Sequence, residues 1–422
     1  MFQVLGSAWA LLLGMLLLMI GNGLQGTLLG LRGAIEGFST FDMSIVMSAY
    51  FVGFLGGSRI APLLIRRVGH VRVFAALGSI ISGVLVLYPT LTDPAAWSIL
   101  RILFGFCFSG VYVTAESWLN NATTNDNRGK ALSAYMIVQM AGITIAQFII
   151  TLGDPSGFVL FIIPSVLVSL SFMPILLSVN PTPAFDTTKP MSLRQLWEAS
   201  PTGCVGMFLM GGVFSAQFGM SAVYGSLAGL SVAQISTFVA TIYIGGLILQ
   251  YPIGYLSDRM DRRRLIMFTA AAGAIAAILG AAFQGNFAVL LVAGFLIGGL
   301  ANPLYALLLA YTNDYLEYED MAAASGGMVF INGVGAISGP VIVGWMMGLI
   351  GPVGFWVYLT FLMLLLAGYS LWRMTQRPSI PVDETSSYTP VLPSASPVAV
   401  ELAQEFDIET AQEEERIDEI EP

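Results

Sequence analysis

Arg101 lies inside an apolar segment, where a charged side chain is costly. Arg101 is followed at helical spacing by Gly105, Ser109, Tyr112 and Glu116, and these fall within about 80° of one another at 100° per residue. A rise of 1.5 Å per residue separates Arg101 from Glu116 by about 22 Å along the helix, which is too far for an ion pair. Arg101 therefore needs another partner, and a guanidinium is well suited to bind an anion.

Amides and phenols supply most of the other polar groups in the apolar segments. Asn22 and Gln25 share a helix face with Arg32, and Gln25 lies at about the depth of Arg101 and Gln217. The candidate substrate-binding residues are Asn22, Gln25, Arg101, Tyr112, Gln139, Gln217, Tyr224, Asn302, Tyr305 and Asn332. The alternative is that the amides only bridge helices. Because no carboxylate lies near the centre of an apolar segment, a neutral or anionic solute is favoured, although aromatic cages also hold cations.

Twelve apolar segments must position these residues, each about 20 residues long and so able to cross a bilayer as a helix. They centre near residues 19, 54, 81, 107, 140 and 168, and near 216, 245, 274, 300, 335 and 363. The composition, 56% apolar and 10% charged with a mean hydropathy of +0.79, excludes a soluble globular protein. We therefore expect an all-α membrane protein whose surroundings are the lipid bilayer.

The chain divides near its middle. We expect an N-terminal six-helix half over residues 1–180, a linker over 181–201 that is rich in proline and charge, and a C-terminal six-helix half over 202–374. Residues 375–422 hold twelve acids and two arginines, so the net charge of −9 belongs to this tail. Its composition predicts disorder, with a weak acidic helix from Val398 onward.

The basic residues indicate the orientation. Of the 17 lysines and arginines, only Arg32 and Arg101 fall toward the side away from the termini. The positive-inside rule then places both termini in the cytoplasm, with the protein in a bacterial inner membrane. Nothing in the charge pattern indicates nucleic-acid binding.

The two halves are related in sequence. An offset of 192 residues superimposes Gly37-Phe38-Ser39 on Gly229-Leu230-Ser231 and Gln25 on Gln217, and an offset of 193 superimposes Gly105 on Gly298. Six helices per half is an even number, so the repeats are parallel, with an expected binding site at the midplane between them.

Several motifs resemble those of the major facilitator superfamily. The stretch "GYLSDRMDRRR" from Gly254 to Arg264 resembles the family's loop motif, with Asp261 where a second glycine is usual. The cognate loop "PLLIRRVGHVRVF" keeps Gly69 but has Arg66 at the place of the aspartate. Arg101-x-x-x-Gly105, "NRGKALSAY" and "ESWLN" also resemble the family, the last in a bacterial subgroup with unassigned substrates. The resemblance implies twelve transmembrane helices, of which the first and fourth of each half line a central cavity.

The resemblance also implies a gate on the cytoplasmic side. The candidate gate residues are Arg66, Arg67, Arg72, Glu116, Arg128, Asp258, Arg259, Arg262, Glu317, Glu319 and Asp320. In the family, the aspartate of this loop lies by the start of the eleventh helix. We expect Arg66, Arg67 or Arg72 to pair here with the acids just before that helix, so that the contact is kept with its charges exchanged. Asp258 is expected near Arg128, and Glu116 is expected to pair with Arg128 or a loop arginine.

These features predict a secondary active or facilitative transporter of a small organic solute that works by alternating access, with proton coupling favoured. The alternative is a membrane assembly factor or receptor that uses the same fold. The sequence has no phosphate-binding loop and no cluster that would serve a metal or cofactor, and Cys107 and Cys204 lie in apolar runs. We therefore expect no enzyme activity, no cofactor and no metal, and we expect a monomer.

Overall fold

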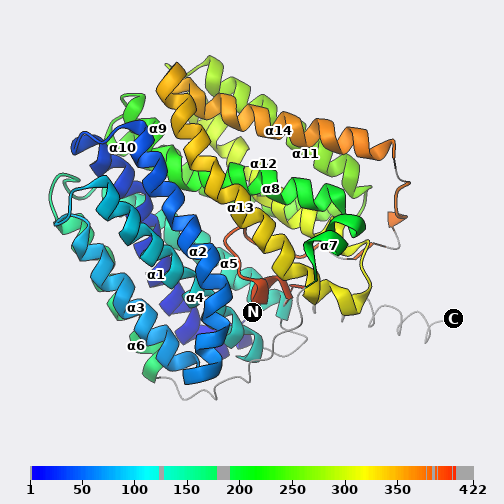
Figure 1. Cartoon of the computed structure of the whole chain (residues 1–422), viewed down its shortest axis with the longest axis horizontal. Coiled ribbons are helices and arrows are strands. Elements are labelled where there is room, and N and C mark those ends of the chain that lie inside the picture. Colours follow the sequence, from blue (N-terminus) through cyan, green and yellow to red (C-terminus); the bar gives the residue numbers. More distant parts are fainter. Residues whose placement is uncertain are drawn as a thin grey trace.

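A computed structural model shows the chain as two bundles of long helices. It describes residues 2–122, 128–177, 191–376, 378–382, 385–386, 388–401 and 403–404. Figure 1 shows the bundles side by side, with the helices of the first half coloured blue to cyan and those of the second green to orange. The fold is all-α, as the sequence predicts.

The first half contains six helices. They are α1 (Phe2–Ile35), α2 (Thr40–Val68), α3 (His70–Leu87), α4 (Pro94–Ala122), α5 (Arg128–Ile150) and α6 (Val159–Leu177). A short helix, α7 (Leu193–Ala199), follows in the connection to the second half.

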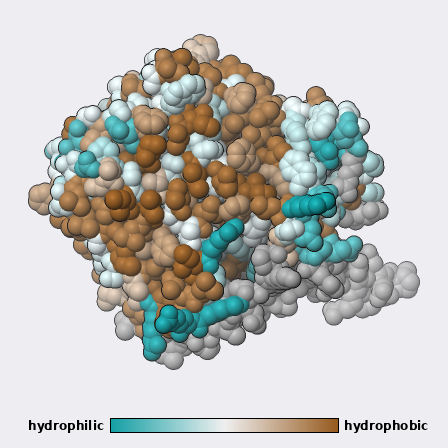
Figure 2. Space-filling model, viewed as in Figure 1, coloured by the Kyte–Doolittle hydropathy of each residue, from teal (hydrophilic) through white to brown (hydrophobic). Residues whose placement is uncertain are grey.

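The second half contains the remaining six spans. The first of them is composite, with α8 (Pro201–Ser215), a π-helical turn η2 (Ala216–Met220) and α9 (Ser221–Leu227) in one run. The others are α10 (Val232–Ser257), α11 (Arg262–Ala282), α12 (Phe287–Asn313), α13 (Tyr318–Ile350) and α14 (Val353–Met374). In the described part of the chain, eleven runs are long and apolar enough to cross a membrane, and α6 is a shorter apolar helix. Figure 2 shows an apolar surface over most of one face, with hydrophilic side chains toward its edges.

The repeat is visible in the turns that start the second span of each half. Gly37 and Gly229 both have positive φ, 76° and 72°, which favours glycine. Each is followed by a serine N-cap in a capping box, Ser39 with Asp42 and Ser231 with Gln234. The same local sequence therefore builds the same helix start twice.

Equivalent glycines also set equivalent helix contacts. A Cβ at Gly53 would collide with the carbonyl of Ile102, and one at Gly245 with the carbonyl of Phe295. These glycines let α2 pack on α4 and α10 pack on α12 at backbone distance. The packing fixes α4, which carries Arg101, against α2.

The two halves meet on the side away from the end of α14, which we call the opposite side. Ser48 of α2 donates a hydrogen bond of 2.5 Å to the carbonyl of Ile337 in α13. Gly30 of α1 approaches Ala222 of α9, where an added Cβ would lie 2.7 Å from the Ala222 Cβ. Toward the other side, which we call the C-terminal side, the two bundles diverge (Figure 1).

After α14 the chain returns to the space between the diverging bundles, where residues 388–401 and 403–404 lie (Figure 1). Its described residues between 378 and 404, which we call the C-terminal segment, include a buried stretch with Val391, Leu392, Ser396 and Val400. Figure 1 shows the red end of the described chain between the two sets of helices. The prediction that all of residues 375–422 are disordered is therefore wrong for this segment. The helical prediction after Val398 agrees with a helix over residues 397–401 and 403–404.

Candidate functional site: a cavity between the two halves

A cavity lies at the middle of the molecule between the halves. Its walls come from α1, α2, α4 and α5 on one side and from α8, η2, α10, α12 and α13 on the other. Five of the ten predicted binding residues line it: Asn22, Tyr112, Gln139, Asn302 and Asn332. The halves therefore contribute together to one site.

The amides of this wall are held by helix carbonyls. Asn302 donates to the carbonyl of Gly298 at 3.0 Å, and Asn332 donates to that of Met207 at 3.1 Å. The Oδ1 atom of Asn22 is buried and has no hydrogen-bond partner among the described residues. A buried acceptor without a partner is costly, so this atom is suited to accept from a ligand.

Aromatic side chains close the cavity on the opposite side. Tyr50 and Phe51 of α2 pack on Phe218 of η2, with ring centroids 5.5 Å and 6.2 Å apart. Phe214 of α8 stacks on Phe218 at 5.7 Å. These rings come from both halves, so they separate the cavity from the opposite side.

Arg101 lies behind Tyr50, fully buried. Its Nη1 donates to Gln25 Oε1 at 2.5 Å, its Nη2 contacts the Met47 sulfur at 3.4 Å, and the guanidinium lies 4.9 Å from the Tyr50 ring centroid. Its Nε has no hydrogen-bond partner in the described structure. The partners of this cation among the described residues are an amide, a thioether and a ring, and none of these is a carboxylate. The site thus keeps an unneutralised positive charge at its closed end.

Three predicted residues lie elsewhere. Gln217 donates to the carbonyl of Ile297 at 3.4 Å and does not join Gln25 at Arg101. Tyr224 stacks on Phe355 at 4.9 Å and packs against Trp356, so it belongs to the core of the second half. Tyr305 is fully buried, is not part of the cavity wall, and its hydroxyl has no described partner. For Gln217 and Tyr224 the difference follows from helix rotation, because the π turn η2 changes the register of this span.

Glu116 is buried on α4 near the C-terminal segment. Tyr135 of α5 donates to its Oε1 at 3.3 Å, and the Ser396 amide donates to its Oε2 at 3.2 Å. The Ser396 hydroxyl also donates a short hydrogen bond to Oε2. The described partners are thus hydroxyl and amide groups, in place of the expected arginine. The side chain of Arg128 lies outside the described residues.

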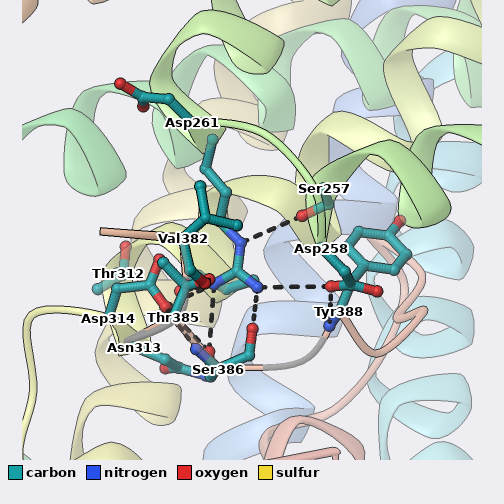
Figure 3. A network of polar contacts seen from close by, with 12 residues as sticks. Ser257, Asp258, Asp261, Thr312, Asn313, Asp314, Val382, Thr385, Ser386 and Tyr388 are labelled. Carbon is teal, nitrogen blue, oxygen red and sulfur yellow. Dashed lines mark hydrogen bonds and ion pairs between the residues drawn. The ribbon is translucent and has the colours of Figure 1, made fainter. Parts of the chain in front are cut away.

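Arg262 of the loop motif is the centre of a second network (Figure 3). It forms a 2.5 Å ion pair with Asp314, lies 3.8 Å from Asp258 and donates to the Ser257 hydroxyl at 3.1 Å. It also donates to the carbonyl of Ser386 in the C-terminal segment. Burial raises the pKa of the Asp314 carboxyl, and the pairing with Arg262 opposes that shift.

The other predicted gate residues whose side chains the structure describes are exposed at the C-terminal side. Arg67 and Arg72 are exposed, as are Glu317 and Asp320, and no ion pair between these described side chains is present. The side chain of Glu319 lies outside the described residues. Arg259 packs on its own helix, 3.7 Å from the Tyr255 ring centroid. The bundles diverge on this side. The contact between Arg66 and the acids before α13 therefore stays a prediction for a state in which the halves meet on the C-terminal side.

The sequence reasoning missed two contributors to the cavity. The first is the set of aromatic residues on α2, α8 and η2. In the sequence, aromatic residues in an apolar segment look like ordinary core residues. The second is Leu392, Pro393 and Ser394 of the C-terminal segment, which form part of the cavity wall. The available signal was that residues 385–400 carry no charge, unlike the rest of the tail.

Comparisons with known proteins agree with this architecture. The family model described as Major Facilitator Superfamily matches residues 11–239 and 203–401. An uncharacterized MFS-type transporter YcaD of Salmonella arizonae is 27% identical over 335 residues, which covers 78% of this chain and 86% of the relative. The Escherichia coli YcaD is 28% identical over 338 residues, with the same coverage.

Solved structures show the same fold. The nucleoside transporter NupG, in a mutant form, superimposes with a TM-score of 0.77 at 15% identity, covering 87% of this chain and 99% of that one. A second NupG structure gives 0.70 at 13% identity, covering 89% and 100%. At these identities the likeness concerns the fold alone. With the family model matching most of the chain, this protein belongs to the major facilitator superfamily of membrane transporters.

Proposed function

We propose that the protein is a secondary transporter of a small neutral or anionic organic solute and that it works by alternating access. The proposal places it in a bacterial inner membrane with both termini in the cytoplasm, because the basic residues gather on that side. The cavity between the halves would then face the cytoplasm in the present conformation. Rocking of the halves would open the side that Ser48 and Ile337 now close.

The observation that carries the proposal is Arg101. A buried guanidinium with no carboxylate among its described partners keeps its charge unneutralised, and that charge attracts an anionic or strongly polar group. The ring of Tyr50 lies between this cation and the cavity that Asn22 and Asn332 line. A bound solute would place its apolar part among the rings and its acceptor toward Arg101.

Proton coupling is supported by Glu116. A charged carboxylate is costly at this depth without a cation, so this group is suited to take up and release a proton as its surroundings change. Its described partners are one backbone amide and two hydroxyls, and a hydroxyl can donate to the carboxylate or accept from the carboxylic acid. Glu116 lies on the same helix as Arg101, so a movement of α4 acts on both.

A ligand-dependent thermal-shift screen of the purified protein tests the proposal. The panel holds organic acids, neutral solutes including nucleosides and sugars, and organic amines. We expect at least one acid or neutral solute to raise the unfolding temperature. The shift should be lost in Arg101→Ala and kept in the control Arg194→Ala, whose side chain is exposed. Shifts caused by amines alone, or an undiminished shift in Arg101→Ala, would contradict it.

A further inference from the structure

The C-terminal segment occupies the mouth of the cavity. Leu392, Pro393 and Ser394 form the part of the cavity wall that belongs to neither half. The free space left is about 40 Å³, whereas a site for a drug-sized ligand is typically about 300–1,000 Å³. Room for a few water molecules remains, but no room for an organic solute.

The segment is held by apolar contacts. Val391, Leu392, Ala399 and Val400 are buried in an uncharged stretch that runs from residue 385 to 400. Pro390, Val391 and Leu392 lie beside Leu132 and Met136 of α5 around a small apolar space. Burial of this kind stabilises a bound segment by removing apolar surface from water.

Polar anchors tie the segment to both halves. In the first half, Ser396 donates to Glu116 of α4 through its amide and its hydroxyl. In the second half, the Tyr388 amide donates to Asp258 at 2.8 Å, and Gln404 donates to Asn313 of α12 at 3.0 Å. A segment bound to both halves opposes their approach on the C-terminal side.

The anchors include the residues of the loop motif. The ring of Tyr388 lies over Gly254, where a Cβ would come 2.6 Å from its Cδ1 atom. Ser386 donates to Asp314 at 3.1 Å through its amide and accepts from Arg262 (Figure 3). While the segment is seated, Asp258 and Arg262 are engaged by it and are not available to a partner in the first half.

We propose that the C-terminal segment is a built-in plug of the solute pathway. It fills the mouth of the cavity on the C-terminal side, holds the halves apart there, and must withdraw before solute can enter or the halves can close. The inhibition of transport rests on the proposed function, whereas the occlusion of the cavity does not.

Labelling of a cysteine in the cavity tests the occlusion without any solute. Ser58, which lines the cavity, is replaced by Cys in a chain whose buried Cys107 and Cys204 are replaced by Ala. Val400→Glu places a charge at a fully buried position of the segment, and Val382→Glu is the matched control at an exposed position. We expect a membrane-impermeant maleimide to label Ser58→Cys at least tenfold faster with Val400→Glu and at the parent rate with Val382→Glu. Equal rates in the parent and Val400→Glu would overturn the proposal.

A second experiment tests whether removal of the segment itself, and not a change in the packing of the helices, raises the labelling rate. Deletion of residues 378–422 should raise the labelling rate as Val400→Glu does, and a synthetic peptide of residues 385–404 added to the deletion variant should lower it again. A peptide with Val400→Glu should have no effect. Slow labelling of the deletion variant, or a peptide that leaves its rate unchanged, would argue against the plug. A failure of every variant to transport would count against the proposed function and not against these rates.

Discussion

Arg101 is held by neutral partners, and this arrangement decides what the cavity can bind. Gln25 fixes one arm of the guanidinium at 2.5 Å, and Tyr50 covers its face. A planar cation that is already oriented loses little freedom when it binds an acceptor. The adjacent amides of Asn22 and Asn332 then add polar groups without adding charge.

Gln25 and Gln217 occupy equivalent positions in the two repeats, but we expect their substitution to have different effects. Gln25→Ala frees Arg101 and should raise the apparent KM for the solute about tenfold or more, since a hydrogen bond to a charged group contributes about 1.5 kcal/mol or more. Gln217→Ala should have a smaller effect, because its amide contacts the Ile297 carbonyl. Uptake kinetics in proteoliposomes measure both. An equal or larger effect of Gln217→Ala would show that the two repeats contribute alike.

A second residue-scale prediction concerns Glu116. Glu116→Gln keeps a carbonyl acceptor for Ser396, and its amide can donate to the Tyr135 hydroxyl, but it cannot exchange a proton. We expect solute counterflow, which needs no net proton movement, to continue, whereas uphill accumulation driven by a pH gradient is lost. Accumulation at the level of the unmodified protein would remove Glu116 from the coupling mechanism.

At the scale of elements, glycines set how closely the helices of each half approach. Gly53→Leu forces α2 away from the Ile102 carbonyl of α4, and overpacking of this kind costs about 1–3 kcal/mol. The variant should unfold several degrees lower in a detergent thermal scan. Gly56→Leu is the control on the same helix, since nothing lies within 4 Å of a Cβ there. Similar unfolding temperatures for the two variants would contradict this account of the packing.

The sequence predicts the elements better than it predicts their rotation. The lengths of the apolar segments and the spacing of the glycines predict the helices. The repeat of Gly37 and Gly229 predicts which helix of the first half corresponds to which helix of the second. The site depends on which face of each helix turns inward. The π turn at Gln217 changes which face of this span turns inward. It does so through local backbone geometry, which no residue pattern in the sequence predicts.

The C-terminal segment was missed for another physical reason. The acids of the tail dominate its average composition, so the whole of residues 375–422 is predicted to be disordered. The uncharged stretch with Val391, Leu392 and Val400 has enough apolar surface to be buried once a cavity is available. Its binding site is built by the two halves together, so it cannot be read from local sequence.

At the scale of the whole molecule, the halves meet on one side and diverge on the other. Alternating access requires the reverse arrangement in another state, and the predicted latch of Arg66 with the acids before α13 belongs to that state. Arg66→Glu and Asp320→Arg should each raise the reactivity of cysteine probes at the C-terminal side, and the double variant should restore it. Effects that only add would exclude a direct pair.

We propose that solute binds between the halves and that the charge of Arg101 anchors it. Counterflow in proteoliposomes with a mixture of organic acids and neutral solutes, read by mass spectrometry, tests this binding. We predict that at least one of them accumulates with the unmodified protein and with the exposed control Arg194→Ala. Arg101→Ala should abolish that accumulation and Arg101→Lys should keep at most part of it, because a point charge cannot replace the planar fork. Accumulation of the same solute by Arg101→Ala at the unmodified rate would contradict the account.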